Sequence, residues 1–190
     1  TAGVGSLTNS YWDIQSSGLS SGVGSGSTAG SVGLTSAQAR LASGYTTMGP
    51  DPEDPDEQIV VASLDFTNDW FLIEGETRPF GRWEHSHQIT NAHQLQLMSM
   101  ELWMPYTLLR DIDLGSALAS PGGMWTDAGF VPIGAAFSPF TGSLDGRSHS
   151  VSGLMIDRPF AEMAGLFGLT RGATISDITL IDVEISGIFR

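Results

Sequence analysis

The chain has 190 residues, of which 41% are hydrophobic and 15% charged, and its formal net charge at pH 7 is −13. This apolar content can bury a core, which excludes a wholly disordered chain, and the acidity excludes nucleic-acid binding through a basic surface. The sequence contains no cysteine and no lysine, which excludes disulfides, thiolate metal sites and lysine Schiff bases. No stretch of the sequence approaches the roughly 20 apolar residues of a membrane span.

Residues 1–49 form the first predicted segment, in which glycine and serine are unusually frequent. These residues favour tight turns and supply little core. Several large apolar residues nevertheless predict a strand-like stretch over 1–15, and the Gly/Ser-rich residues 16–34 predict an irregular loop after it. Thr35 and Gln38 then have the spacing of a capping box, which predicts a short helix at this point.

Residues 50–90 form the second predicted segment, an acidic loop followed by short strands. Three prolines and five acids fill residues 50–57, which excludes a helix or a central strand. Calcium prefers carboxylate ligands, so calcium binding by residues 51–57 stays open, although their spacing matches no calcium loop. The apolar runs at 59–62 and 70–73 predict strands.

Residues 91–190 form the third predicted segment, a helix followed by repeated short strands. Apolar residues recur at three- and four-residue steps over 91–102, as on one face of a helix, and Thr90 or Asn91 can cap its first turn. We expect this helix to cover the first strands of the repeat, because an uncovered edge exposes unpaired amides and carbonyls.

Short apolar groups separated by glycine turns occupy residues 106–188 and predict an all-β sandwich, barrel or solenoid. A sandwich would contain more hairpin dipeptides than the single Asp145-Gly146. Residues 174–186 alternate apolar and polar positions as one coil of a parallel β-helix would. The residues of this coil expected to point inward are Ile175, Ile178, Leu180, Val183 and Ile185.

Four apolar residues in this region recur at nearly equal intervals, with glycine turns between them. This recurrence indicates equivalent positions in a repeated structure. We therefore predict that residues 106–188 form a parallel β-helix and that four residues lie in its interior: Leu144, Leu154, Leu166 and Ile178.

Several short motifs resemble a known family. Residues 139–146 (PFTGSLDG), 149–154 (HSVSGL) and 165–168 (GLFG) occur in that order. They resemble the GLUG-motif repeat regions of large bacterial surface and secreted proteins, including filamentous-haemagglutinin-like exoproteins and adhesins. Residues 9–13 (NSYWD) and 70–75 (WFLIEG) resemble other parts of the same family.

The resemblance implies a right-handed parallel β-helix that is displayed outside the cell or on its surface as a scaffold without catalytic residues. In this family the Tyr-Trp-Asp motif typically closes a solenoid, whereas here it comes first. We therefore expect head-to-tail stacking, either between subunits or between neighbouring repeats of a longer chain. The residues expected at this assembly contact are Val4, Leu7, Tyr11, Trp12, Ile14, Leu180, Ile181, Val183 and Ile185.

Two groups of residues have spacings that suggest chemistry. His85, His87 and His93 resemble metal ligands, but zinc also needs a fourth ligand, and a polar connection is the favoured interpretation. Asp111 and Asp113 leave the same side of a strand. Paired carboxylates can hydrolyse glycosidic bonds, whereas short acidic side chains more often cap backbone amides, and we expect the latter here.

A catalytic triad is not expected. His149, Asp145 and Ser148 or Ser150 supply its residue types, but the sequence has no nucleophile elbow. The tryptophans are expected to seal the core more often than to form a platform for stacking on sugars. They are Trp12, Trp70, Trp83, Trp103 and Trp125.

These observations predict a non-catalytic structural module of a bacterial extracellular adhesin or filament, without a cofactor or a resident metal ion. A carbohydrate-binding or polysaccharide-cleaving β-helix is the alternative, with a surface glycan or host receptor as its partner. The two hypotheses differ in whether acidic and aromatic residues converge in one groove.

Overall fold

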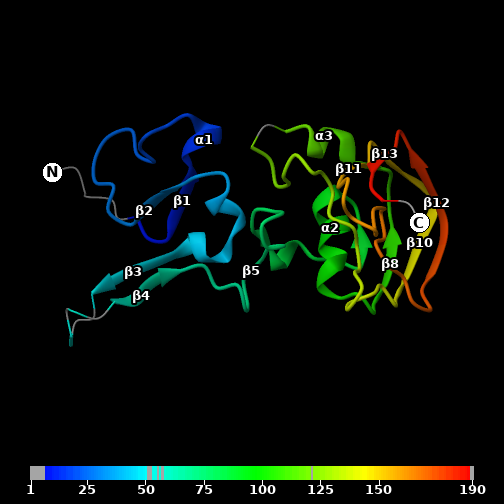
Figure 1. Ribbon diagram of the computed structural model, residues 1–190, viewed down its shortest axis with the longest axis horizontal. Helices are drawn as coiled ribbons and strands as arrows, with labels where there is room; N and C mark the ends of the chain where they lie inside the picture. Colours follow the sequence, from blue (N-terminus) through cyan, green and yellow to red (C-terminus); the bar gives the residue numbers. More distant parts are fainter. Residues whose placement is uncertain (1–6, 51–52, 55, 57, 121, 189–190) are drawn as a thin grey trace. The chain divides into compact units, whose positions relative to one another are not determined.

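The computed structural model describes residues 7–50, 53–54, 56, 58–120 and 122–188, and it contains many strands and little helix (Figure 1). The chain divides into two compact units, residues 1–79 and 80–190. This division falls between the two boundaries predicted from composition, after residues 49 and 90. Composition marks loops, whereas a compact unit is defined by which segments pack together.

The first unit is built from short strands and single helical turns. Its parallel pair β1–β2 is followed by the antiparallel pair β3–β4, which flanks the predicted acidic loop. The strands are β1 (Ser10–Asp13), β2 (Ser31–Leu34), β3 (Thr46–Pro50), β4 (Gln58–Ser63) and β5 (Trp70–Phe71), and the helices are α1 (Ile14–Ser17) and the 3₁₀ helices η1 (Gln38–Arg40) and η2 (Ala42–Tyr45).

The predicted loop over 16–34 and the predicted helix after Thr35 both differ in detail from the structure. The predicted loop over 16–34 ends in strand β2, whose residues gain a backbone partner in β1 that local composition cannot reveal. The capping box is confirmed, because Gln38 N donates to Thr35 Oγ1 over 3.1 Å and Thr35 N donates to Gln38 Oε1 over 2.9 Å. The helix that follows consists of two 3₁₀ turns, since the extended backbone of Leu41 separates them.

The second unit contains the longer strands. Its strands are β6 (Phe80–Gly81), β7 (Gln88–Ile89), β8 (Pro105–Leu108), β9 (Ile112–Asp113), β10 (Ser143–Ser152), β11 (Met155–Asp157), β12 (Thr174–Ile181) and β13 (Glu184–Ser186). Its helices are η3 (Arg82–Glu84), α2 (Ala92–Leu97), η4 (Met98–Met100) and α3 (Leu114–Leu118).

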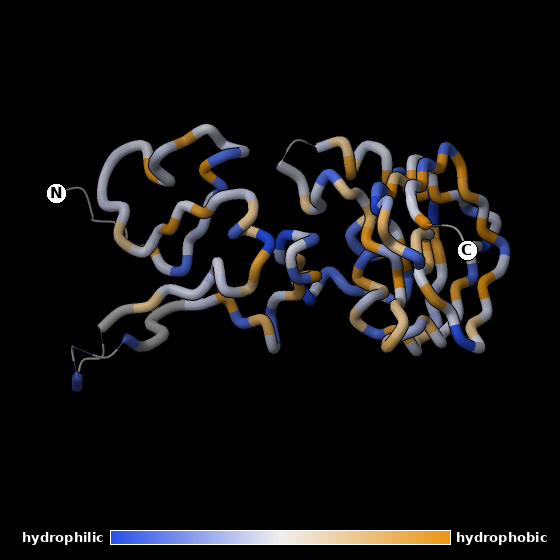
Figure 2. Tube along the Cα trace, in the orientation of Figure 1, coloured by the Kyte–Doolittle hydropathy of each residue, from blue (hydrophilic) through white to orange (hydrophobic). Residues whose placement is uncertain are grey.

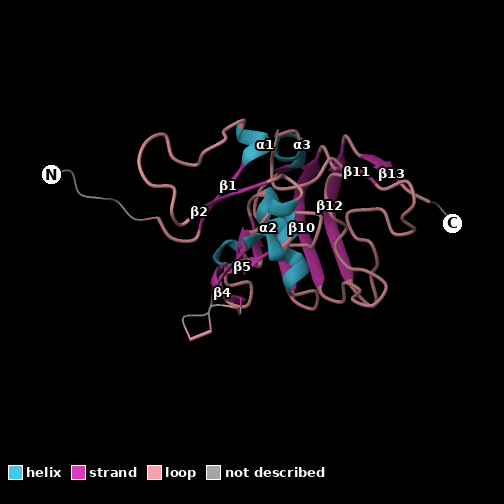
Figure 3. Ribbon diagram, turned by 60° about the vertical axis from the view of Figure 1, so that its left-hand side comes forward, coloured by secondary structure: helices cyan, strands magenta, loops and turns pink. Residues whose placement is uncertain are grey.

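Strands β7 to β13 of the second unit pair in parallel. One sheet has the order β12-β10-β8-β7, with β9 also paired to β10, and a second sheet joins β11 to β13. Strands β8, β10 and β12 lie side by side in Figure 1, and β10 and β12 do so again in Figure 3. Parallel pairing requires a long connection between partners, which explains the many loops of this region.

The pairing register shows how far apart along the chain paired residues lie. Leu144 pairs with Ile175 in the larger sheet, and Ile156 pairs with Ile185 in the smaller one. Stacked partners are therefore much further apart along the chain than Leu144, Leu154 and Leu166 are from one another. The regular intervals seen in the sequence separate successive segments of the chain, and not stacked partners. Of the four predicted interior residues, these three leucines are buried and Ile178 is half-buried.

The corners between strands also align. Gly153, after β10, and Asp182, after β12, both have positive φ, at 67° and 52°. Gly153 N donates to Ile181 O over 2.9 Å, and Glu184 N donates to Leu154 O over 2.8 Å, so the two corners stay in register. A Cβ at Gly153 would also lie 2.6 Å from the backbone of Gly115, so this corner requires glycine.

Helix α2 covers the end of the stack opposite β12. Within this unit α2, β8, β10 and β12 follow in that order in Figure 1, and the order of α2, β10 and β12 repeats in Figure 3. Asn91 caps the helix by accepting from Gln94 N over 2.9 Å, and Leu95 and Met98 are fully buried, as predicted. The predicted helix over 91–102 is shorter here, because its last turn becomes η4.

Candidate functional site

The unpaired edge of β12 and the corner after it carry exposed apolar side chains. Within the described part of the chain β12 pairs on one side only, with β10. Four apolar residues of this edge and corner keep 40–43% of their surface exposed: Ile175, Leu180, Ile181 and Val183. Hydrophobic residues along the outer strands of this unit appear orange in Figure 2.

This exposure qualifies the predicted coil. Ile175 and Leu180 pair with the buried Leu144 and Val151 and so share the interior face of the sheet, as expected, but no further strand covers them in the described residues. Val183, also expected to point inward, is exposed in the corner after β12. Ile178 and Ile185 are half-buried. Alternation of apolar and polar residues indicates which side chains share a face, whereas their burial also depends on a neighbouring strand on both sides. The exposed residues therefore form a candidate assembly surface, defined as Ile175, Leu180, Ile181 and Val183.

The predicted N-terminal assembly residues have different environments. Leu7 and Ile14 are exposed, whereas Tyr11 and Trp12 are half-buried within their own unit. The Tyr11 hydroxyl donates to Tyr45 O over 2.7 Å, and Trp12 Nε1 donates to Leu19 O over 3.2 Å. Val4 lies outside the described residues, as do most positions of the acidic loop considered for calcium.

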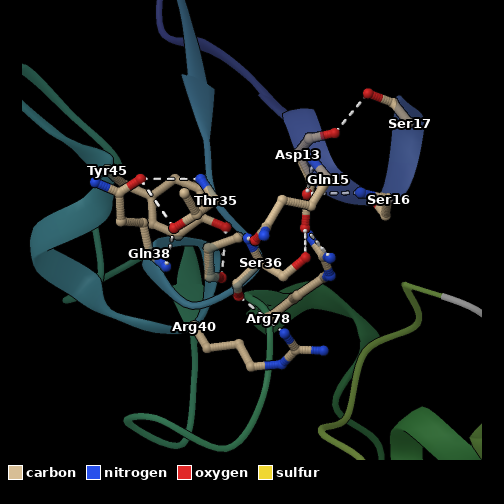
Figure 4. A network of polar contacts seen from close by, with 11 residues as sticks. Asp13, Gln15, Ser16, Ser17, Thr35, Ser36, Gln38, Arg40, Tyr45 and Arg78 are labelled. Carbon is tan, nitrogen blue, oxygen red and sulfur yellow. Dashed lines mark hydrogen bonds and ion pairs between the residues drawn. The ribbon is translucent and has the colours of Figure 1, made fainter. Parts of the chain in front are cut away.

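Asp13 is the centre of a polar network in the first unit (Figure 4). It caps α1 by accepting from Gln15 N and Ser16 N over 2.8 and 2.9 Å. Its other oxygen accepts from Ser36 Oγ over 2.7 Å and forms an ion pair with Arg78. The network therefore ties together three segments that lie far apart in the sequence.

The network makes the stability of the first unit dependent on pH. Burial raises the pKa of Asp13, but hydrogen bonds from Ser16, Ser36, Arg78 and Gln15 outweigh burial and hold this pKa far below its ordinary value. The contribution of a carboxyl with a depressed pKa is complete above its unfolded pKa of about 3.9 and is lost as the pH falls towards the folded value.

We therefore expect the first unit to lose stability progressively below about pH 4, and Asp13→Asn to lower its stability at neutral pH while removing most of this dependence. Amide exchange of Gln15 and Ser16 as a function of pH measures the effect. Asp65→Asn is the control, because Asp65 also accepts from two backbone amides, those of Thr67 and Asn68, but is exposed. Equal pH dependence of wild type and Asp13→Asn would contradict the prediction.

Asp111 and Asp113 cap backbone amides, as predicted. Asp111 Oδ1 accepts from Ser150 N over 2.8 Å, and Asp113 Oδ1 accepts from Ser116 N over 3.0 Å at the start of α3. The amide of Ser150 lowers the pKa of Asp111, and the hydroxyl of Ser116 lowers that of Asp113. Both carboxyls therefore stay ionised in neutral solution, which does not suit a general acid.

An open groove of about 710 Å³ lies beside these two aspartates. Its described lining combines the ends of α2, β9 and α3 and contains no Trp, Tyr or Phe. A carbohydrate-binding or polysaccharide-cleaving protein was expected to bring acidic and aromatic side chains together in one groove. The described lining of this groove does not do so. The lining residues are Thr90, Asn91, Ala92, His93, Arg110, Asp111, Ile112, Asp113, Ser116 and Ala117.

The predicted triad residues have other partners. His149 Nδ1 lies 3.3 Å from Asp111 Oδ1, while Asp145 Oδ1 accepts from Arg147 N over 2.9 Å. Asp145-Gly146 lies inside strand β10 and not in a hairpin turn. The described contacts thus do not bring His149 and Asp145 together.

The histidines separate into two groups. His93 Nδ1 lies 2.7 Å from Glu84 Oε2, away from the other two histidines. His85 and His87 instead lie beside Glu101, and one candidate ligand atom from each of these three residues is within 4.8 Å of the others. The sequence spacing identified the His85–His87 pair but missed Glu101, because the whole of α2 lies between His87 and Glu101 in the sequence.

The tryptophans also divide. Trp125 is 5% exposed and seals the core, but it is the one buried tryptophan of the five, so the expectation that most of them do so is not met; Trp83 and Trp103 are 69% and 66% exposed. Trp12 and Trp70 are half-buried. The two exposed side chains in the second unit are thus the candidates for contact with a ligand.

The chain is similar to a very long protein. It is 40% identical over 87 residues to Halomucin from Haloquadratum walsbyi. The match covers 43% of this chain and 1% of Halomucin. No protein-family profile matches the chain, and no solved structure matches it. None of the helices in the described residues is long and apolar enough to cross a membrane.

Proposed function

We propose that the chain is a non-catalytic structural module of a microbial extracellular or cell-surface protein, with residues 106–188 forming a right-handed parallel β-helix. The observation that carries the proposal is the unpaired edge of β12, with its exposed apolar residues, at the end of a parallel strand stack. Such an edge is the surface that a further coil would cover.

The parallel β-helix is supported by the register and the corners. Between the last two strands of each sheet the partners are separated by similar lengths of chain, as Leu144 and Ile175 are in one sheet and Ile156 and Ile185 in the other. The corners at Gly153 and Asp182 share a left-handed backbone. Additional parallel bridges join Ile133 to Phe167 and Phe140 to Thr170, so the stacking extends beyond the two sheets. A repeat with the same corners on successive coils is typical of a solenoid.

The extracellular setting is supported by composition and by the relative. Halomucin, which the chain matches over part of its length, is a large extracellular protein. The net charge of −13 keeps such a surface soluble in salty surroundings. The resemblance to GLUG-motif repeats of bacterial surface proteins supports the same setting, and because the organism of Halomucin is archaeal, the proposed source is bacterial or archaeal.

The occupant proposed for the candidate assembly surface is the next coil of a longer chain. The great length of Halomucin favours this arrangement over a filament of separate subunits. A second copy of the chain offers its exposed Leu7 and Ile14, and its binding there is the second form of the same head-to-tail contact.

The experiment compares Leu180→Asp/Val183→Asp with Leu109→Asp, whose leucine is also exposed but lies after β8. Sedimentation over a range of concentrations should show the wild type and Leu109→Asp associating, and the double variant remaining monomeric with unchanged circular dichroism. Association that is equal in all three proteins, or absent from the wild type at high concentration, would argue against the surface as a stacking site.

Trp83 and Trp103 support the alternative, a carbohydrate-binding module, because exposed aromatic rings stack on sugars. Glycan-array binding by the wild type that is lost in Trp83→Ala and Trp103→Ala would favour this alternative. Lack of binding in all three proteins would favour the scaffold.

A further inference from the structure

Three side chains with metal-binding groups converge beside the first strands of the second unit. His85 and His87 lie in the extended segment between η3 and β7, and Glu101 follows η4. One ligand atom from each lies within 4.8 Å of the other two, and His87 Nε2 is 2.9 Å from Glu101 Oε2. This is the single such group among the described residues.

Backbone pairing holds the three residues in place. Thr107 N, in β8, donates to His87 O over 2.9 Å, which fixes the histidine segment against the sheet. Glu101 N donates to Met98 O over 3.2 Å at the end of η4. The segment from η3 to β7 and the segment from η4 to β8 therefore present their side chains to the same place.

The buried ring of Tyr106 orders the cluster. Its hydroxyl donates to Glu101 O over 3.0 Å and lies 3.1 Å from His85 Nε2. Because the single hydroxyl proton is donated to Glu101 O, the hydrogen bond to His85 uses a proton on Nε2. The rings of His85 and His87 meet edge to face, with centroids 5.3 Å apart.

We propose that His85, His87 and Glu101 bind a divalent transition-metal ion, with Zn²⁺ as the best match, and that water completes the coordination. Two imidazoles and one carboxylate are a known donor set for zinc, in which the fourth position stays open. This donor set contains nitrogen and oxygen but no sulfur, which suits a chain without cysteine.

The geometry requires only side-chain adjustment. Metal–ligand distances of about 2.0–2.1 Å place the ligand atoms of a tetrahedral site roughly 3.3 Å apart. The side chains of His87 and Glu101 are 41% and 37% exposed, so they can rotate and the ion can enter. Ligation through His85 Nε2 breaks its hydrogen bond to Tyr106 and places the proton of the neutral ring on Nδ1, so the ring changes tautomer without losing a proton.

The ion would link the segments on either side of α2, and thus fasten the helix that covers the strand stack.

The test is calorimetric titration of the tag-free, chelator-treated chain with ZnCl₂ at pH 7.5, together with thermal unfolding with and without zinc. We expect one ion per chain and a raised Tm. His87→Ala and Glu101→Gln should each weaken binding at least tenfold and remove the rise in Tm. His93→Ala is the matched control, because His93 also contacts a glutamate, Glu84, but lies outside the cluster.

NMR of the histidine rings gives a second readout that does not depend on a change in stability. Zinc should shift the signals of His85 and His87 and leave those of His149 unchanged. Absence of zinc binding in the wild type overturns the proposal, as do affinities in His87→Ala and Glu101→Gln equal to that of the wild type. Glu101→Gln keeps the shape of the side chain, so a folded variant is expected for this comparison.

Discussion

Leu166→Asp is expected to destabilise the second unit by about 4 kcal/mol or more, because a carboxylate would enter an apolar stack without a partner. Leu166 is 6% exposed, and its carbonyl accepts from Ile133 N over 3.0 Å, where Ile133 and Phe167 form a parallel bridge. Phe167, the residue after Leu166, also packs against Phe140, with the two ring centroids 4.9 Å apart. Urea unfolding followed by circular dichroism measures the loss.

Leu180→Asp is the matched control for this substitution. Leu180 lies on the unpaired edge strand β12 and is exposed, so its replacement at low protein concentration should cost about 1 kcal/mol or less. A similar loss in the two variants would mean that burial in the parallel stack does not determine the effect. Leu166→Ala should fall between them, at about 2–4 kcal/mol, since it removes apolar contact without adding a charge.

Gln96→Leu is expected to have the second large effect, a loss of about 3–5 kcal/mol. Gln96, in α2, is fully buried, and its side-chain amide pairs with the backbone of Val131 as a neighbouring strand would. Its Nε2 donates to Val131 O over 3.0 Å, and its Oε1 accepts from Val131 N over 3.0 Å. The same oxygen accepts from Trp125 Nε1 over 2.8 Å. Leucine would remove three hydrogen bonds, two to the backbone of the half-buried Val131 and one to the indole of the buried Trp125, at about 1–3 kcal/mol each before relaxation.

Gln88→Leu is the control, because Gln88 is exposed on β7 and its substitution should change stability little. Unfolding followed by tryptophan fluorescence measures the stability of the two variants, and amide exchange at Val131 shows whether its backbone hydrogen bond is lost. If Gln96→Leu retains the protection of the Val131 amide, the side chain does not act as the partner of this backbone segment. Gln96→Glu should also destabilise, since it removes the donor to Val131 O and buries a charge.

Local patterns in the sequence predicted local features. The capping box of Thr35 and Gln38, the Asn91 cap of α2 and the capping roles of Asp111 and Asp113 all involve backbone groups that the residue types specify. The buried face of α2, with Leu95 and Met98, follows from helical periodicity. These features depend on neighbours within a turn, or on a general preference of acidic side chains for amides.

Long-range partners could not be predicted in this way. The spacing of Leu144, Leu154 and Leu166 was correct as a sign of interior positions, but the stacking partner of Leu144 is Ile175. Parallel strands are joined by long connections of variable length, so one sequence does not specify which residues meet. Burial of Leu180 likewise depends on a second neighbour, which its apolar character alone cannot supply.

The sequence by itself determined the chemistry available to this protein: a strongly acidic, cysteine-free chain with short apolar strands and glycine corners. Only the tertiary structure decided which polar groups meet. It placed Arg78 on Asp13, Gln96 on the backbone of Val131, and Glu101 beside His85 and His87. The physical reason is that each contact closes a long loop, and its partners are selected by the packing of whole segments and not by local preference.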